Sequence, residues 1–440
     1  MDDLSAARLQ MATSLGFHIV FACIGMTMPW LMAAAQYRYL RTREAIYLEL
    51  ARAWAKGVAV FFAVGAVSGT VLSLELGFLW PTFMRHAGPI IGLPFSWEGT
   101  AFFLEAVALG LFLYGWQRVP EKVHFASGIL VGVCGVASGI LVVSANAWMN
   151  SPAGFRWVDG QALEVDPVAA MFNDAWAAQA IHMTLAAFVA TAFAAAGVHA
   201  SRLLVHPNHP LHTRALPIAL AFASVSALLQ PLSGDHSAKD VARRQPAKLA
   251  AMEALYRTER GAPLLIGGLP DDRSEQVHFG VEVPYALSVL AFGDPEAEVR
   301  GLTSFPPDLR PPTLICHLAF QIMVGAGSVL AMLGLVYAYF RRKRLHEQLP
   351  RWFLRSLALC TPLGFLAVEA GWTVTEVGRQ PFIIYGVMRT KDAVSPMPGL
   401  IWPLVMSLVV YAVLVTVVTA ISVRLVRTLE AKHLPGAEHG

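Results

Sequence analysis

A glutamate at the end of a long apolar segment is the residue of this chain whose surroundings most clearly suggest chemistry. Glu376 follows the apolar run 353–373 and precedes Arg379 by three positions. A carboxylate at membrane depth is costly unless a cation neutralises its charge. That cation could belong to a metal cofactor, or it could be Arg379 in an internal ion pair. The spacing alone leaves both interpretations open.

Four more side chains of ligand type lie in other apolar runs: His18, Glu98, His182 and Met323. At about 1.5 Å of helical rise per residue, they and Glu376 fall in the same half of a membrane. Imidazole, thioether and carboxylate groups hold haem iron, and a histidine with a methionine gives a six-coordinate, electron-transferring haem. A lone histidine is often a hydrogen-bonded structural residue, and a lone methionine is often core packing. Five such residues at similar depth favour a cofactor.

Two acids in the run 97–116 suggest proton transfer. Glu98 and Glu105 are seven positions apart, so a helix places them on roughly one face. Carboxylates in file inside a membrane are typical of a proton relay. The alternative is that each is neutral and hydrogen-bonded to a neighbouring helix. Glu75 and Glu369 are also in apolar runs, and for these we favour a structural role.

The composition of the whole chain indicates a membrane protein. Hydrophobic residues make up 56% of the 440 residues and charged residues only 14%, and the mean hydropathy is +0.53. A soluble domain of this length does not need such a composition to bury its core. The formal charge of +3 gives no support to a nucleic-acid partner. The chain is predicted to be an all-α integral membrane protein.

The sequence predicts about nine transmembrane helices, because nine apolar runs approach or exceed the roughly 20 residues that cross a bilayer. They lie near 13–35, 57–80, 97–116, 126–146, 170–200, 216–232, 313–340, 353–373 and 400–423. The N-terminus lacks the basic region of a signal peptide, so the first run is expected to remain as a helix. Lys and Arg gather after each odd-numbered run, which predicts an outside N-terminus and a cytoplasmic C-terminus.

These runs divide the chain into three regions. Residues 1–232 hold six helices, residues 233–311 form an extracytoplasmic loop, and residues 312–440 hold three more helices. An unbroken loop of this length is usually functional. It contains Lys248 and Glu253 on a short amphipathic stretch, where on pattern alone they would be an ordinary solvated face.

Several segments together resemble the large subunit, subunit I, of the cytochrome bd family of quinol oxidases, of the type with a short quinol loop. They are GWTVTEVGRQP at 371–381, the opening segment 7–18, IHMT at 181–184, QPAKLAAMEA at 245–254, FQIMVGAG at 320–327 and SANAWMNSP at 144–152. These segments follow in the family's order and span nearly the whole chain. A helix end with an interfacial tryptophan explains 144–152, and we assign it no chemistry.

The resemblance implies a set of haem ligands. His182 and Met323 would hold a low-spin haem b, and His18 and Glu376 would hold a pair of high-spin haems, with Glu98 as a further candidate ligand there. Which haem of the pair takes which residue stays open.

The resemblance also gives roles to residues beside the haems. Trp372 would pack between the haems or be a plain interfacial tryptophan. Arg379 would pair with a haem propionate or with the surroundings of Glu376.

Further roles concern protons and substrate. In the family, acids that match Glu105 and Glu98 bring protons to the oxygen site. Residues that match Lys248 and Glu253 hydrogen-bond the quinol, and Glu253 would accept a proton.

The implied activity is quinol oxidation at the outer face and reduction of O2 to water, with proton motive force generated without pumping. The implied cofactors are two haem b and one haem d, with haem b as the alternative for the third. The implied substrates and partners are ubiquinol or menaquinol, O2, a second large subunit (subunit II), a small single-helix subunit and the lipid of a bacterial inner membrane.

Other function classes fit the residues less well. A cyanide-insensitive variant with haem b in place of haem d is the nearest alternative. A haem-free secondary transporter should show internal repeats, which the sequence lacks. A structural membrane subunit would leave the carboxylates unexplained.

Two residues depart from the family pattern. Phe382 stands where a tryptophan is common, and this change is expected to affect packing near the high-spin pair. Gln321 stands where some members carry arginine, which removes a cation near the low-spin haem.

Overall fold

The computed structural model describes residues 1–158, 161–345 and 349–431. The long helices are α1 (Asp3–Thr42), α2 (Ala45–Leu79), α3 (Pro81–Tyr114), α4 (Glu121–Asn150), α6 (Trp176–Val205), α7 (Pro210–Arg244), α10 (Thr313–Arg342), α12 (Leu363–Val377) and α13 (Ile401–Ala431). Within the described ranges, nine segments are long and apolar enough to cross a membrane. The prediction of an all-α membrane protein with about nine spans is therefore confirmed.

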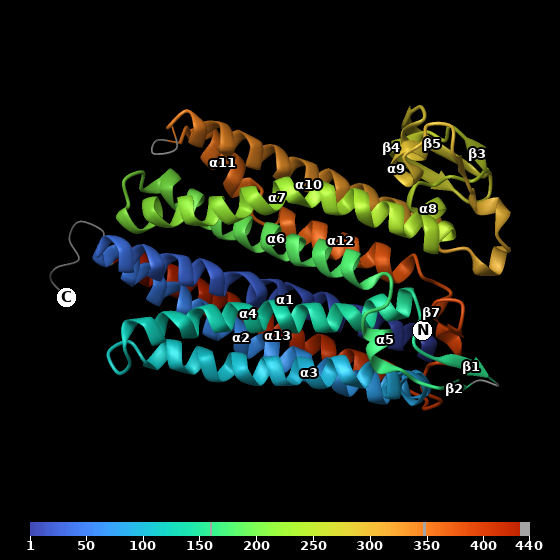
Figure 1. Ribbon diagram of the computed structural model, residues 1–440, viewed down its shortest axis with the longest axis horizontal. Coiled ribbons are helices and arrows are strands. Elements are labelled where there is room, and N and C mark those ends of the chain that lie inside the picture. The colour runs from blue at the N-terminus through green and yellow to red at the C-terminus, as the bar shows by residue number, and fades with distance from the viewer. Residues whose placement is uncertain (159–160, 346–348, 432–440) are drawn as a thin grey trace.

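The spans form two adjoining groups (Figure 1). Helices α1 to α4 pack against one another, and α6, α7, α10 and α12 form the second group. The groups meet where α1 and α4 contact α6, and α13 lies against α1 and α2. Small residues allow close approach: a Cβ added to Gly135 on α4 would lie 2.9 Å from the carbonyl oxygen of Gly25 on α1.

The eighth span is bent, although its sequence reads as one apolar run. It consists of α11 (Arg351–Leu359) and α12, separated by residues 360–362. Pro362 has no N–H to continue the helical hydrogen bonds and marks the point where the second helix begins. The bend lies toward the opposite end of this span from Glu376.

The sixth predicted helix continues further than its apolar run. α7 extends through Pro231 to Arg244, about three turns beyond residue 232. Ion pairs of i,i+4 spacing, Asp235 with Lys239 and Asp240 with Arg244, support this polar extension. The loop itself therefore begins at Gln245.

The N-terminus and the long loop lie at one end of the helix bundle, which we call the loop end (Figure 1). The loop comprises α8 (Pro246–Met252), α9 (Ala286–Phe292) and strands β3 (Glu259–Arg260), β4 (Leu264–Asp271), β5 (Gln276–Val283) and β6 (Glu298–Val299). β4 and β5 form an antiparallel hairpin, and β3 pairs with β6. Two other hairpins lie at the same end: β1 (Arg156–Val158) with β2 (Gln161–Leu163), and β7 (Phe382–Ile384) with β8 (Met388–Arg389). The short α5 (Pro167–Met171) precedes α6.

Candidate functional site

His18 on α1 is held in one tautomer by a serine of α2. Its Nδ1 lies 2.9 Å from Oγ of Ser68, and that hydroxyl donates its only hydrogen to the carbonyl oxygen of Val64 at 2.9 Å. With the hydroxyl hydrogen on this carbonyl, Ser68 accepts from His18, and Nδ1 of His18 carries the ring hydrogen. Nε2 keeps its lone pair, which is the arrangement that a metal-ligating histidine requires.

His182 on α6 repeats this arrangement. Its Nδ1 lies 3.0 Å from Oγ of Ser233, which donates to the carbonyl oxygen of Gln230 at 2.8 Å. Nδ1 again carries the hydrogen and Nε2 keeps a lone pair. The amide nitrogen of Gln230 lies 3.2 Å from that Nε2 and also 3.3 Å from the backbone carbonyl oxygen of His182.

Glycines leave room beside the candidate ligands. A Cβ at Gly69 would lie 3.1 Å from Cε1 of His18, and a Cβ at Gly371 would lie 3.0 Å from the sulfur of Met323. Met323 is on α10 and faces α12 through Gly371, inside the group of helices that also holds His182. The surroundings of these three residues therefore fit haem ligation.

Glu376 has two partners at the end of α12. One carboxylate oxygen accepts from Nδ2 of Asn146 on α4, and the other accepts from Arg379 at 2.5 Å. The ion pair with Arg379, one of the two interpretations of the sequence, is thus present. Each carboxylate oxygen keeps a second lone pair, so the pair does not prevent binding of a metal.

Arg379 has guanidinium hydrogen-bond donors that Glu376 does not use. Its side chain is only 2% exposed, and its Nε and Nη1 have no hydrogen-bond partner among the residues that the structure describes. Unpaired buried guanidinium donors are costly and suit a further anion such as a carboxylate. Trp372 lies nearby on α12 and packs against a buried cluster to which α1, α6 and α12 contribute residues. Its position does not agree with a plain interfacial tryptophan.

The two acids of α3 occupy different settings. Glu98 accepts a hydrogen bond of 3.0 Å from Ser138 on α4, and Glu105 is buried. Glu75 accepts hydrogen bonds from Gln10 and Ser14, in agreement with the structural role expected for it. Within the described ranges, no three His, Cys, Asp or Glu side chains are arranged to hold a bare metal ion. Candidate ligands that occur singly suit the axial positions of haems.

Lys248 and Glu253 are buried rather than solvated, contrary to the pattern-only interpretation. They are 4% and 3% exposed, because α8 packs against the ends of α10 and α12 through Ala250, Met252 and Val374. Burial, with a smaller effect from nearby Arg379, lowers the pKa of Lys248 to about 7. Burial raises the pKa of Glu253 to about 8.

A chain of hydrogen bonds joins the loop to Glu376. Nζ of Lys248 donates to Oδ1 of Asn150 at 2.8 Å, and Nδ2 of Asn150 donates to Oδ1 of Asn146 at 3.0 Å. Asn146 then donates to Glu376. The two asparagines lie in SANAWMNSP, to which the sequence analysis assigned no chemistry. Two asparagines four positions apart at the end of a helix were the sequence feature that could have indicated a polar site here.

Two residues of α10 hydrogen-bond to the backbone of the loop, and the sequence did not predict this role for either of them. His317 is fully buried, with Nδ1 2.8 Å from the carbonyl oxygen of Met252 and Nε2 3.0 Å from that of Gly267. Gln321 donates to the carbonyl oxygen of Leu265 at 2.8 Å and accepts from the N–H of Gly267 at 3.0 Å. Gln321, which the sequence marked only as a lost cation, thus anchors β4. The sequence feature that could have indicated this contact is His317, one helical turn before Gln321.

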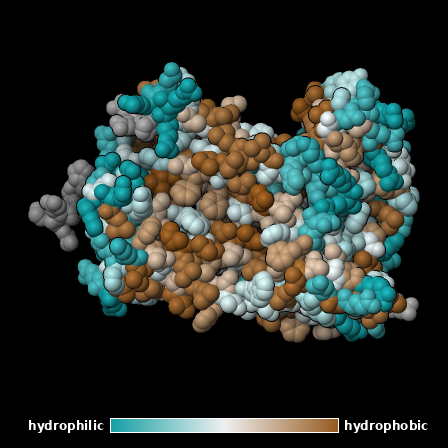
Figure 2. Space-filling view, viewed as in Figure 1, coloured by the Kyte–Doolittle hydropathy of each residue, from teal (hydrophilic) through white to brown (hydrophobic). Residues whose placement is uncertain are grey.

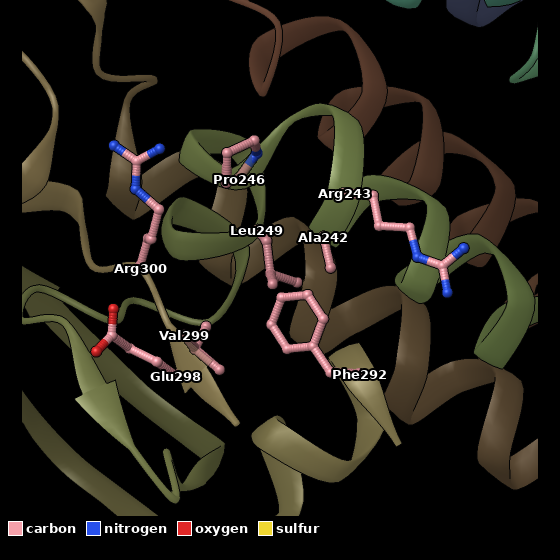
Figure 3. A pocket seen from close by; sticks show the side chains of 8 residues that line it. All are labelled: Ala242, Arg243, Pro246, Leu249, Phe292, Glu298, Val299 and Arg300. Carbon is pink, nitrogen blue, oxygen red and sulfur yellow. The ribbon is translucent and has the colours of Figure 1, made fainter. Parts of the chain in front are cut away.

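A pocket of about 370 Å³ lies on another side of α8 (Figure 3). Its walls are Ala242, Arg243, Pro246, Leu249, Phe292, Glu298, Val299 and Arg300. In Figure 3, Leu249 and Phe292 meet at its centre while the guanidinium groups of Arg243 and Arg300 point outward. Neither Lys248 nor Glu253 lines it, so this pocket is separate from the proposed quinol residues.

Comparison with known proteins identifies the family of this chain. The fold, with nine spans in the described ranges, is that of a multi-pass membrane protein. The family model for cytochrome bd terminal oxidase subunit I matches residues 6–430, and the chain belongs to this family.

Three relatives show the extent of the similarity. The provisionally named cytochrome bd menaquinol oxidase subunit I of Bacillus subtilis (strain 168) is 35% identical over 90% of this chain and 90% of its own length. The cytochrome bd ubiquinol oxidase subunit 1 of the same organism is 32% identical over 90% of this chain and 87% of its own. The bd oxidase structure from Geobacillus thermodenitrificans superposes with a TM-score of 0.91 at 36% identity, covering 97% of this chain and 99% of the other.

Proposed function

We propose that this chain oxidises quinol beside α8 and passes the electrons to bound haems, where O2 is reduced to water. The observation that carries this proposal is the hydrogen-bond chain from Lys248 through Asn150 and Asn146 to Glu376. It joins the two segments, QPAKLAAMEA and GWTVTEVGRQP, whose family roles are substrate binding and haem ligation. The names of the relatives, which specify menaquinol or ubiquinol oxidases, support quinol as the substrate.

The proposed low-spin ligands are His182 and Met323. Ser233 keeps the hydrogen of His182 on Nδ1 and so presents Nε2. Gly371 leaves the sulfur of Met323 uncovered by a side chain. An imidazole with a thioether fits a low-spin haem b.

The proposed high-spin ligands are His18 and Glu376, with Glu98 as a further candidate. Ser68 presents Nε2 of His18 in the same way that Ser233 does for His182. The unpaired Nε and Nη1 of Arg379 would bind a haem propionate while its Nη2 holds Glu376 in place. Trp372, packed against the cluster of α1, α6 and α12 residues, would separate the haems.

The bound haems, two haem b and one haem d, supply the one-electron transfers and the iron centre for oxygen. Haem b is the alternative for the third haem, because the same side chains hold either macrocycle. The chain would provide each axial ligand as a single side chain. It also keeps a buried cation, Arg379, beside the proposed ligand Glu376.

At the substrate site, Glu253 and Lys248 would hydrogen-bond the two quinol oxygens. A carboxyl with pKa of about 8 is mostly protonated at pH 7, so only its deprotonated fraction can accept the proton of a quinol hydroxyl. Lys248, with pKa of about 7, has the ammonium and amine forms in similar amounts near neutrality. Asn150 keeps its Nζ in place in both forms.

The topology proposed from the charges puts the loop end outside and the C-terminus in the cytoplasm of a bacterial inner membrane. Protons from quinol would then leave outside, and protons for water would enter through Glu105 and Glu98 from the cytoplasm. Charge separation would follow without a pump. Subunit II, which the family implies, and a small single-helix subunit would complete the oxidase.

The test is the purified complex in nanodiscs, assayed for quinol-dependent O2 consumption and for its reduced-minus-oxidised spectrum. Quinol oxidation with low-spin and high-spin haem bands is the expected result. A complex that contains no haem, or that contains haem and oxidises no quinol, would contradict the proposal.

A further inference from the structure

The β4–β5 hairpin carries exposed apolar side chains on one face, beside Leu264, which itself packs against a buried cluster of the loop. Leu264 pairs with Val283 and Ile266 pairs with Val281, and directly opposite residues share a face. Phe279 lies two positions before Val281 on β5. Phe279 is 91% exposed and Val281 64% exposed. Such a continuous apolar face is unusual on a water-facing surface.

The backbone of Phe279 strengthens this observation. Its φ is +63°, in the left-handed region that bulky side chains seldom adopt. The residue thus combines an unfavourable backbone with an almost fully exposed ring. Transfer of the ring into an apolar environment would remove the cost of its exposure and offset the cost of the backbone conformation.

The hydrogen bonds to α10 fix the hairpin beside the first turns of this membrane-spanning helix. His317 and Gln321, which bind Leu265 and Gly267 of β4, follow the first residue of α10 by four and eight positions. That corresponds to about 6 and 12 Å along the helix. The neighbouring residues Ile315 and Ile322 of α10 are exposed and apolar. The hairpin therefore lies beside a part of α10 whose free surface faces lipid.

The surface views agree with this position. Figure 1 places β4, β5 and α9 on the side of the loop that faces back along the helices. In Figure 2, apolar side chains line that side of the loop, next to the apolar belt of the bundle. The far side of the loop is mostly hydrophilic.

We infer that the β4–β5 hairpin is a membrane-contacting element, with Ile266, Phe279, Val281 and Val283 in the interfacial layer of the leaflet at the loop end. Apolar side chains on one face of an otherwise polar element bind in this way to the boundary between headgroups and acyl chains. The continuity of this face with the lipid-facing surface of α10 identifies lipid as the occupant. The contact does not depend on which substrate the loop binds.

The inference is tested with nitroxide labels on the complete oxidase in phosphatidylcholine–phosphatidylglycerol nanodiscs. Val281→Cys places a label on the apolar face, and Glu282→Cys places the matched control on the opposite face of the same strand. Cys360 is replaced by serine in both, because the other three native cysteines are buried. Collision with O2, which concentrates in lipid, is compared with collision with a water-soluble nickel chelate.

The expected result is a severalfold higher ratio of O2 to nickel collisions at position 281 than at position 282. Equal ratios at the two positions would mean that water covers the face and would overturn the inference. A label at position 281 that neither reagent reaches would mean that protein, such as subunit II, covers it, and would overturn it as well. Val283→Cys supplies a second label on the same face if the first variant does not assemble.

Discussion

The ammonium group of Lys248 donates a hydrogen bond of 2.8 Å to the side-chain oxygen of Asn150, which ends α4 almost a hundred residues earlier in the chain. Asn150 also accepts from Gln245 at 3.3 Å, so the start of the quinol loop is attached to α4 at two points. Through Asn146 the same chain reaches Glu376. A substitution at Asn150 should therefore alter the hydrogen bonding of both Lys248 in the loop and Glu376, the proposed haem ligand.

Replacement of Asn150 tests this link. Asn150→Ala leaves buried Lys248 without its acceptor, which costs about 1–3 kcal/mol and corresponds to a loss of roughly 5- to 150-fold in quinol kcat/KM. Asn150→Asp places a negative charge beside Lys248 and should raise the pKa of Lys248 above its value of about 7. The check is the pH profile of quinol oxidation in both variants. Unchanged profiles would show that Asn150 does not act on the site.

The low-spin ligands are tested by His182→Ala and Met323→Leu. Each removes one of two proposed axial ligands, so the six-coordinate low-spin band should be lost together with quinol oxidation. Met332→Leu is the matched control, because Met332 is on the same helix but faces outward. It should keep both the band and the activity. A low-spin band in both ligand variants would refute the assignment.

Glu253 gives a pH prediction. Its folded pKa of about 8 lies above the ordinary value of 4.5, so the deprotonated, proton-accepting form grows about tenfold per pH unit up to pH 8. Quinol kcat/KM should rise with pH over this range and level off above it. Glu253→Gln should lower the rate and flatten the profile.

Glu259→Gln, an exposed acid of the same loop, serves as the control and should keep the rise. Oxygen reduction with an artificial donor that enters at the haems should be unaffected in Glu253→Gln. An equal loss with both donors would indicate a folding defect instead.

His317 and Gln321 are predicted to act as positioning residues for Glu253. His317→Leu removes the ring N–H that lies between the carbonyl oxygens of Met252 and Gly267, which costs roughly 1–3 kcal/mol and loosens β4. Faster amide hydrogen exchange in residues 264–268 and a raised KM for quinol are expected, with an unchanged haem spectrum. His317→Gln, which keeps a donor, should restore part of the KM. Normal exchange in the leucine variant would contradict this role.

Glu105→Leu tests the proton route. Glu105 is about two turns, roughly 10 Å, from Glu98 and is not a proposed ligand, so haem content should survive. Oxidation of the fully reduced enzyme by O2 should become slow, because proton transfer is then rate-limiting. Glu98→Leu should in addition alter the spectrum of the oxygen-binding haem. An unaltered oxidation rate with normal proton uptake in Glu105→Leu would make that acid structural.

The sequence by itself determined the class of the protein and the types of its candidate ligands. Apolar runs of membrane length indicate spans whatever their neighbours are, and the motifs around His18, His182, Met323 and Glu376 are local. The family assignment rested on the same local patterns, and the comparisons confirmed it. The extent of α7 was underestimated, because ion pairs and packing of Ala242 against α8 and α9 continue the helix past Pro231, where hydropathy ends.

Only the tertiary structure decided which groups meet. Asn146 and Glu376 are 230 residues apart, and Ser68 selects the tautomer of His18 from another helix. Gln321 is merely a lost cation in the sequence, yet folding turns its amide toward the backbone of β4. Hydrogen bonds between distant segments depend on how helices pack to within a few tenths of an ångström. Residue types and spacing along one segment do not contain that information.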